Sequence, residues 1–270
     1  MPNQFTHPWT PLEIDFLKYN IQKLTYKQMG NSINRSPASI QSKVRSLPYK
    51  KRVKKYLANY NFFQIWSEEM AYVLGFIAAD GNICHSGRAH VLHIACDDKD
   101  IIKKIKQVLD YKGPIHEKTR IDSRISYSLR ICDITIFKDL QKLNITERKS
   151  LTFNPPLIPK RLVRHFIRGY FDGDGSVSFR NSKYPSRLVV DFYTASKQMA
   201  EFLHRTVKAI LKDYYDGKIS VRNTNQKTKY YAIRIGHKAS VKIFIYMYKN
   251  TNLYLERKYK KFTEGMNYGN

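Results

Sequence analysis

VLGFIAADG at Val73–Gly81 and IRGYFDGDG at Ile167–Gly175 are two copies of one nine-residue pattern, with glycine third and Asp-Gly at the end. Each copy ends a segment whose apolar residues are spaced as on one face of a helix. An aspartate there is locally unfavourable, because it lies at the negative end of the helix dipole. The repetition predicts a positive partner for Asp80 and Asp174, and a metal ion is the obvious candidate.

The sequence around the two motifs repeats on a long period. Each half has the pattern of helix, two strands, helix, two strands, helix, and the halves close on similar strings, ERKSLTF at Glu147–Phe153 and ERKYKKF at Glu256–Phe262. Polar and apolar residues alternate strictly over Arg124–Ile131, as in a strand with one buried face. We expect an α+β fold of tandem pseudo-twofold αββαββα repeats with saddle-like antiparallel sheets, preceded by a small three-helix bundle.

The charge balance predicts a nucleic-acid partner. The 270 residues include 48 Lys and Arg against 22 Asp and Glu, a net charge of +26, and such an excess binds phosphate. A basic protein that binds no nucleic acid is the less favoured alternative. The length corresponds to roughly two domains.

The cysteines and the hydropathy indicate where the protein acts. Cys84, Cys96 and Cys132 form no disulfide framework, and no apolar run is long enough to be a signal peptide or to span a bilayer. Lysine, asparagine, isoleucine and tyrosine have AT-rich codons and are abundant. We expect a soluble intracellular protein without a membrane partner, in a phage-infected or bacterial cytoplasm or in an organelle.

The first 48 residues have the start signals of three helices. Thr10 with Glu13 and Thr25 with Gln28 are capping boxes, and Ser36 precedes a proline at a helix start. The WT-x-x-E opening and the RSPASIQSKVRSL ending resemble a Myb/SANT-type helix-turn-helix over about 45 residues. A generic three-helix bundle that binds protein is the alternative. If the resemblance holds, the third helix offers side chains that can meet bases and phosphates: Gln41, Lys43 and Arg45.

Four segments are expected along the chain. The helix-turn-helix occupies residues 1–48, and a basic linker follows over 49–66. The linker contains the charge run Lys50–Lys55, which suits phosphate tracking. The first repeat covers 67–157 and the second repeat covers 158–270.

The paired motifs, their separation and the repeated order of helices and strands resemble the LAGLIDADG homing-endonuclease family over roughly residues 67–265. The resemblance implies a monomeric two-motif enzyme that cuts double-stranded DNA at a specific site, using Mg²⁺ or Mn²⁺, and that is associated with an intron. The last acidic residue of each family motif binds metal, which maps onto Asp80 and Asp174. A catalytic lysine near each site maps onto Lys149 and Lys258.

The sequence departs from the family pattern at the sixth motif position. The second copy has Asp172 there, whereas the first copy has Ala78. This position is not the usual metal ligand, so we expect Asp172 to be less essential than the terminal aspartates. The departure puts the equal activity of the two halves in doubt.

The residues themselves support a shared metal site. Gly75, Gly169 and Gly173 are small enough to let two helix backbones approach closely, which would bring Asp80 and Asp174 together. Two neighbouring carboxylates repel, and one tends to keep its proton. A hard divalent cation relieves the repulsion, and it can activate water for attack on a phosphodiester.

Further arginines lie in or beside the expected strands, where they can contact DNA. They are Arg88, Arg120, Arg124, Arg130, Arg180, Arg187, Arg222 and Arg234.

Other functions remain open. A DNA-binding regulator that does not cleave, or a maturase that binds its own intron RNA, could use the same scaffold. Zinc binding by His90, His93 and Cys96 is disfavoured, because their spacing matches no finger. An intein-borne nuclease is also less favoured, because the printed sequence does not begin with a splicing nucleophile and ends in Tyr-Gly-Asn.

Overall fold

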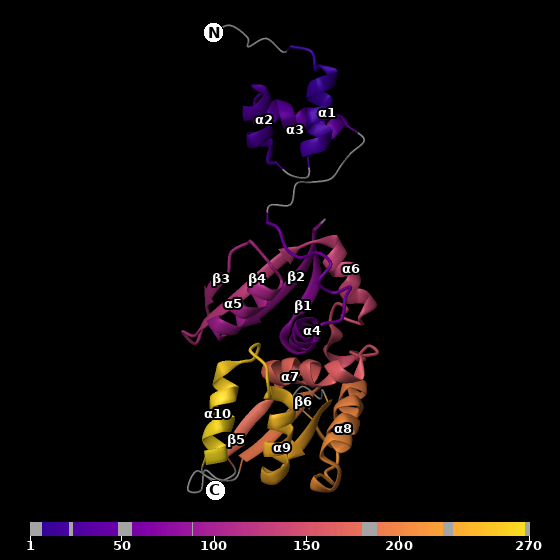
Figure 1. The fold of residues 1–270 in the computed structure, drawn as a ribbon, viewed down its shortest axis with the longest axis vertical. Coiled ribbons are helices and arrows are strands. Elements are labelled where there is room, and N and C mark those ends of the chain that lie inside the picture. The colour runs from indigo at the N-terminus through magenta and orange to yellow at the C-terminus, as the bar shows by residue number, and fades with distance from the viewer. Residues whose placement is uncertain are drawn as a thin grey trace. The chain divides into compact units, whose positions relative to one another are not determined.

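The computed structural model describes residues 7–21, 24–47, 56–87, 89–179, 188–223 and 229–267. The chain forms two compact units, Met1–Leu57 and Ala58–Asn270, which are drawn in Figure 1 and described here one at a time. None of the described helices has both the length and the apolar character needed to cross a bilayer.

The first unit contains α1 (Pro11–Asn20), α2 (Tyr26–Ile33) and α3 (Pro37–Ser46). The expected caps are present: Thr10 and Thr25 each form a capping box, and the Ser36 hydroxyl accepts a hydrogen bond from the Ser39 N–H. Capping of this kind satisfies N–H groups that a helix start leaves free. The helices enclose a small core made of Leu17, Ile21, Met29, Ile40, Val44 and Leu47.

The second unit consists of two repeats that share the order helix, two strands, helix, two strands, helix, and the second repeat ends in one more helix (Figure 1). The first repeat comprises α4 (Glu68–Asp80), β1 (Asn82–Ser86), β2 (Ala89–Cys96), α5 (Lys99–Val108), β3 (His116–Thr119), β4 (Ile125–Cys132), α6 (Ile134–Lys142) and the 3₁₀ turn η1 (Lys149–Leu151). The second comprises η2 (Lys160–Leu162), α7 (Val163–Asp174), β5 (Ser176–Phe179), β6 (Leu188–Thr194), α8 (Lys197–Leu211), η3 (Lys212–Tyr214), β7 (Ser220–Asn223), β8 (Lys229–Ile235), α9 (His237–Tyr248) and α10 (Glu256–Asn267). The expected α+β fold of tandem repeats is confirmed.

The two four-stranded sheets have the same topology. Their strand orders are β1-β2-β4-β3 and β5-β6-β8-β7, and all neighbouring strands are antiparallel. Helices α5 and α6 pack on the first sheet, and α8 and α9 pack on the second. The predicted alternation is observed at the C-terminal end of β4, where Leu129 and Ile131 are buried and Arg130 between them is exposed, whereas Ile125 at the start of the strand is exposed. The Arg130 side chain therefore lies on the face of the first sheet opposite that of Leu129 and Ile131.

Helices α4 and α7 lie side by side and join the two repeats (Figure 1). Their backbones approach so closely that a Cβ atom on Gly75 would lie 2.1 Å from the Phe166 carbonyl oxygen. A Cβ on Gly169 would lie 1.9 Å from the Tyr72 carbonyl oxygen. Real Cβ contacts are not this short, so glycine is required at both positions. The close approach expected from the small motif residues is thus observed, and one apolar core runs through both repeats.

Candidate active site at the ends of α4 and α7

The two motif aspartates are the last residues of the paired helices. A Cβ on Gly173 would lie 2.4 Å from the Ala79 Cβ and 3.5 Å from Asp80 Oδ2, so the two helix ends touch. Burial raises the pKa of Asp80 above its ordinary value. Burial and then the charge of Asp80 raise the pKa of Asp174 to about 6. The structure therefore brings the two carboxylates into one electrostatic site.

Neither motif carboxylate, of Asp80 or of Asp174, has a hydrogen-bond or ion-pair partner among the residues that the structure describes. Both side chains remain accessible to solvent although protein surrounds them closely enough to raise their pKa values. Two accessible carboxylates with unused lone pairs, at the negative ends of two helices, form a site suited to a cation.

The two lysines of the repeated strings are buried, each with 5% exposure. Lys149 Nζ donates a hydrogen bond to the Gly81 carbonyl at 2.7 Å. Lys258 Nζ donates to the carbonyls of Phe171 and Asp172 at 2.6 and 2.8 Å. Each ammonium therefore satisfies free carbonyls at the end of its own repeat's motif helix.

Burial also lowers the pKa of each lysine, to about 8 in both cases. The charges of Asp80 and Asp174 act against this shift at both lysines, and Asp172 acts against it more strongly at Lys258. All four predicted site residues thus lie close enough to influence one another. At neutral pH the lysines supply positive charge to a centre that would otherwise be negative.

Asp172 has a different environment from the terminal aspartates. Its fully buried carboxylate accepts hydrogen bonds from the Tyr72 and Tyr248 hydroxyls at 2.8 and 2.6 Å, and from the Leu255 N–H at 2.9 Å. Its lone pairs are used inside the protein, so Asp172 joins α7 to α4, α9 and the start of α10. The first repeat has Ala78 at this position, and the two halves of the site are therefore supported differently.

A cavity of about 330 Å³ lies beside Asp80. Its lining includes Asp97 and Asp98, which form the β2–α5 connection, together with Arg120 and Arg257. Arg120 contacts Asp97 at 3.1 Å, and Arg257 contacts Asp98 at 3.1 Å. Sequence reasoning missed Asp97, Asp98 and Arg257. The only available signal was the place of Arg257 in the repeated string, directly before Lys258.

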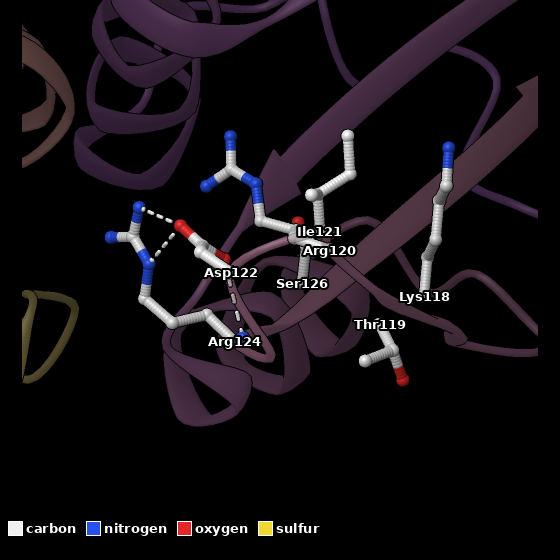
Figure 2. A pocket seen from close by; sticks show the side chains of 7 residues that line it. All are labelled: Lys118, Thr119, Arg120, Ile121, Asp122, Arg124 and Ser126. Atoms are coloured by element: carbon white, nitrogen blue, oxygen red, sulfur yellow. Dashed lines mark hydrogen bonds and ion pairs between the residues drawn. The ribbon is translucent and has the colours of Figure 1, made fainter.

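Five of the predicted DNA contacts of the second unit lie in or beside described strands: Arg130, Arg222 and Arg234 lie on strands, and Arg120 and Arg124 lie in the β3–β4 connection. The β3–β4 hairpin carries Arg120, Arg124 and the fully exposed Ile121, and Asp122 pairs with the Arg124 guanidinium (Figure 2). Arg130 and Arg234 occupy matching places in the two sheets. Arg130 pairs in register with His93, which pairs with Asn82 at the start of β1. Arg234 pairs in register with Asp191, which pairs with Ser176 at the start of β5.

The remaining predicted contacts are distributed over both units. Arg222 is exposed on β7, and Arg234 forms an ion pair with the buried Asp191 at 2.7 Å. On α3, Gln41 and Arg45 are exposed, whereas Lys43 is half-buried with its ammonium 5.8 Å from the Trp9 ring centre. The other three predicted contacts lie outside the described residues: Arg88, Arg180 and Arg187.

The site has few protein ligands for a metal. Among the residues that the structure describes, no three His, Cys, Asp or Glu side chains gather around a point that could hold an ion. Mg²⁺ often takes only one or two carboxylates and completes its shell with water and substrate phosphate. Asp80 and Asp174 fit that ligand set, because they are accessible, close together and not paired with any residue that the structure describes.

Comparisons with known proteins identify the domain type. The sequence profile of the LAGLIDADG-like domain matches residues 67–150 and 161–246. The chain is 32% identical over 174 residues to a "Probable translation initiation factor IF-2" of Methanocaldococcus jannaschii. The aligned residues make up 58% of this chain and 14% of that protein. It is 26% identical over 115 residues to the "Uncharacterized protein MJ0314" of the same organism, with 41% and 42% covered. The chain thus spans less than half the length of either relative.

Two solved structures are similar to the chain at low identity. The homing endonuclease I-WcaI bound to its DNA recognition sequence has 14% identity and a TM-score of 0.46, covering 75% of this chain and 90% of that one. I-DmoI in complex with DNA and Mn has 16% identity and a TM-score of 0.45, covering 69% and 98%. The profile match alone spans more than half of the sequence, one copy in each repeat. The chain therefore belongs to the family of proteins with LAGLIDADG-like domains.

Proposed function

We propose that the protein is a homing endonuclease, a site-specific enzyme that hydrolyses double-stranded DNA with a divalent metal ion. The observation that carries the proposal is a pair of accessible carboxylates, Asp80 and Asp174, at the touching ends of α4 and α7, which have no partner in the described part of the chain. Two lysines with pKa values of about 8 flank them. A chain of net charge +26 supplies the attraction for the polyanionic substrate.

Asp80 and Asp174 would hold Mg²⁺ or Mn²⁺. When bound there, the ion supplies an activated water for in-line attack and stabilises the leaving oxygen. Asp174, with a pKa of about 6, is ionised at pH 7.5 and available as a ligand. The ammonium groups of Lys149 and Lys258 hold their protons at Nζ near neutral pH, and their charge favours the negative charge that develops on the phosphate.

The DNA would lie along the polar faces of the two sheets. Arg130 and Arg234 occupy matching positions, so the two half-sites would be contacted from equivalent places. Arg124 and Arg222 extend the same basic surfaces. Because one chain contains both repeats, and therefore both aspartates, the geometry supports action as a monomer.

The first unit would bind a flank of the site. Its short helices, with Gln41, Lys43 and Arg45 on α3, suit a Myb/SANT-like helix-turn-helix that places α3 against bases and phosphates. The proposal also places the helix-turn-helix at residues 1–48, a basic linker at 49–66 and the two repeats at 67–157 and 158–270. It includes association with an intron and an intracellular location.

A cleavage selection tests the proposed function. Purified protein is incubated with Mg²⁺ and a randomised or genomic DNA pool, and new ends are sequenced. Wild-type protein should yield one family of related sites cut on both strands, whereas the Asp80→Asn/Asp174→Asn protein should yield none. Asp100→Asn, an exposed carboxylate on α5, is the matched control and should cut normally. Identical ends from wild type and the double variant would refute the proposal. Binding without cutting would indicate a regulator, and preferential binding of intron RNA would indicate a maturase.

A further inference from the structure

Each lysine-bearing string, Glu147–Phe153 or Glu256–Phe262, accepts a hydrogen bond from a residue of the opposite repeat or donates one to it. Asp98 precedes α5 in the first repeat, and its Oδ2 accepts hydrogen bonds from Arg257 Nε and Nη2 at 3.2 and 3.1 Å. Ser196 precedes α8, the matching helix of the second repeat, and its hydroxyl donates to the Phe153 carbonyl at 2.6 Å. Asp98 and Ser196 are the N-cap residues of equivalent helices, and each reaches across to the string of the other repeat.

The Asp98 contact is made in place of helix capping. Asp98 stands at the N-cap of α5, but its side chain accepts no hydrogen bond from the helix. Aspartate is a favoured N-cap because it satisfies such N–H groups. Here its carboxylate is turned toward Arg257 instead, into the wall of the cavity beside Asp80.

The two contacts between the repeats, Asp98 with Arg257 and Ser196 with Phe153, are close in the sequence to Lys258 and Lys149. These two contacts are called the ties. Arg257 directly precedes Lys258 in the sequence. Lys104 of the first repeat makes a second contact nearby: its Nζ donates a hydrogen bond at 3.3 Å to the carbonyl of Tyr254, four residues before Lys258. In the other direction, the Phe153 N–H donates to the Lys149 carbonyl at 2.8 Å, which closes the turn that Ser196 anchors. A shift of either tie would therefore move the ammonium that caps the motif helix.

We propose that Asp98 and Ser196 are positioning residues that act across the boundary between the repeats. Asp98 fixes Lys258 through Arg257, and Ser196 fixes Lys149 through Phe153. The inference rests on the proposed function, since it assigns each half of the site a dependence on the other repeat. One repeat therefore cannot form a correctly set half-site without the other.

The two ties differ in physical character. The side chains of Arg257 and Asp98 are 62% and 29% exposed, so salt screens their attraction. Ser196 has no exposed surface, and its neutral hydrogen bond is insensitive to salt. Raising the salt concentration should therefore disturb the position of Lys258 before that of Lys149.

Strand-resolved cleavage tests the inference. The target duplex carries a different label on each strand, and single-turnover rates are measured with saturating protein. Asp98→Asn should slow one strand about threefold, as expected for loss of an exposed ion pair. Ser196→Ala should slow the opposite strand about tenfold, as expected for loss of a buried hydrogen bond. Asp100→Asn, which removes an exposed pair with Lys103 on the same helix, should change neither rate.

Two further measurements separate positioning from general damage. Arg257→Gln combined with Asp98→Asn should add no further loss, because the pair acts as a unit. Lysines are acylated with an amine-reactive reagent in the absence of metal and DNA, and the modified residues are identified by mass spectrometry. Acylation should become faster at Lys258 in the Asp98→Asn protein and at Lys149 in the Ser196→Ala protein. Thermal melting identifies any variant that fails to fold. If Ser196→Ala does, the Asp98→Asn results stand alone.

Several results would overturn the inference. One is that Asp98→Asn slows the cleavage of both strands equally. Another is that a folded variant has the wild-type cleavage rates and the wild-type acylation rates at both lysines. If the wild-type protein cuts no DNA, the proposed endonuclease function fails, and the acylation pattern still decides whether the ties hold the lysines.

Discussion

Replacing Asp174 with asparagine should stabilise the metal-free protein at neutral pH. The fold raises the pKa of Asp174 from its ordinary value of 3.8 to about 6, so the ionised form is less favourable in the folded than in the unfolded chain. Stability therefore falls as pH rises from about 4 to 6, and the penalty is fully present above pH 6. The shift corresponds to at most ~3 kcal/mol. Because water reaches the carboxylate and screens it, we expect about 1 kcal/mol.

The assay is urea unfolding with a chelator at several pH values. At pH 7.5 the Asp174→Asn protein should exceed wild type by about 1 kcal/mol in the free energy of unfolding, and the difference should vanish toward pH 4. Added Mg²⁺ should stabilise wild type more than the variant, because binding to the folded state alone shifts the equilibrium. Asp100→Asn should change little. A variant that is less stable at pH 7.5, or a difference independent of pH, would refute the reasoning.

Three further perturbations have defined outcomes. Asp172→Ala leaves the Tyr72 and Tyr248 hydroxyls unpaired in the core and should cost about 2–4 kcal/mol in urea unfolding, whereas an unchanged midpoint would remove its structural role. Gly169→Ala places a Cβ 1.9 Å from a carbonyl oxygen and should lower stability by more than about 3 kcal/mol, measured by thermal melting, with a folded wild-type-like protein as the contrary result. Arg130→Ala should reduce the slope of log affinity against log salt by about one in DNA titrations, and an unchanged slope would exclude a phosphate contact.

The fold was accessible from the sequence because its signals are local. The helix starts at Thr10, Thr25 and Ser36 depend on a cap residue and its neighbours three positions on, and the strand faces depend on alternation. The duplicated motifs predicted the pairing of α4 and α7, because a glycine has no side chain and so lets the backbones of two helices approach closely.

The support of the site was not accessible, because it depends on contacts between residues far apart in the chain. Identical ERK openings fold differently: η1 is a short 3₁₀ turn, whereas α10 continues for three turns. Pro155 and Pro156 follow the first string and stop a helix there, which explains that difference afterwards. The burial of Lys149 and Lys258 and the tie between Asp98 and Arg257 need the packed repeats, so no pattern within one repeat predicts them.

Linearisation of a supercoiled plasmid that carries the selected target tests most directly whether Asp80 and Asp174 form one shared centre. With Mg²⁺, the wild-type protein should convert the plasmid to linear product. The single variants Asp80→Asn and Asp174→Asn should each bind the target with wild-type affinity and yield no linear product, with nicked circles at most. Linear product from either single variant at the wild-type rate would contradict the account.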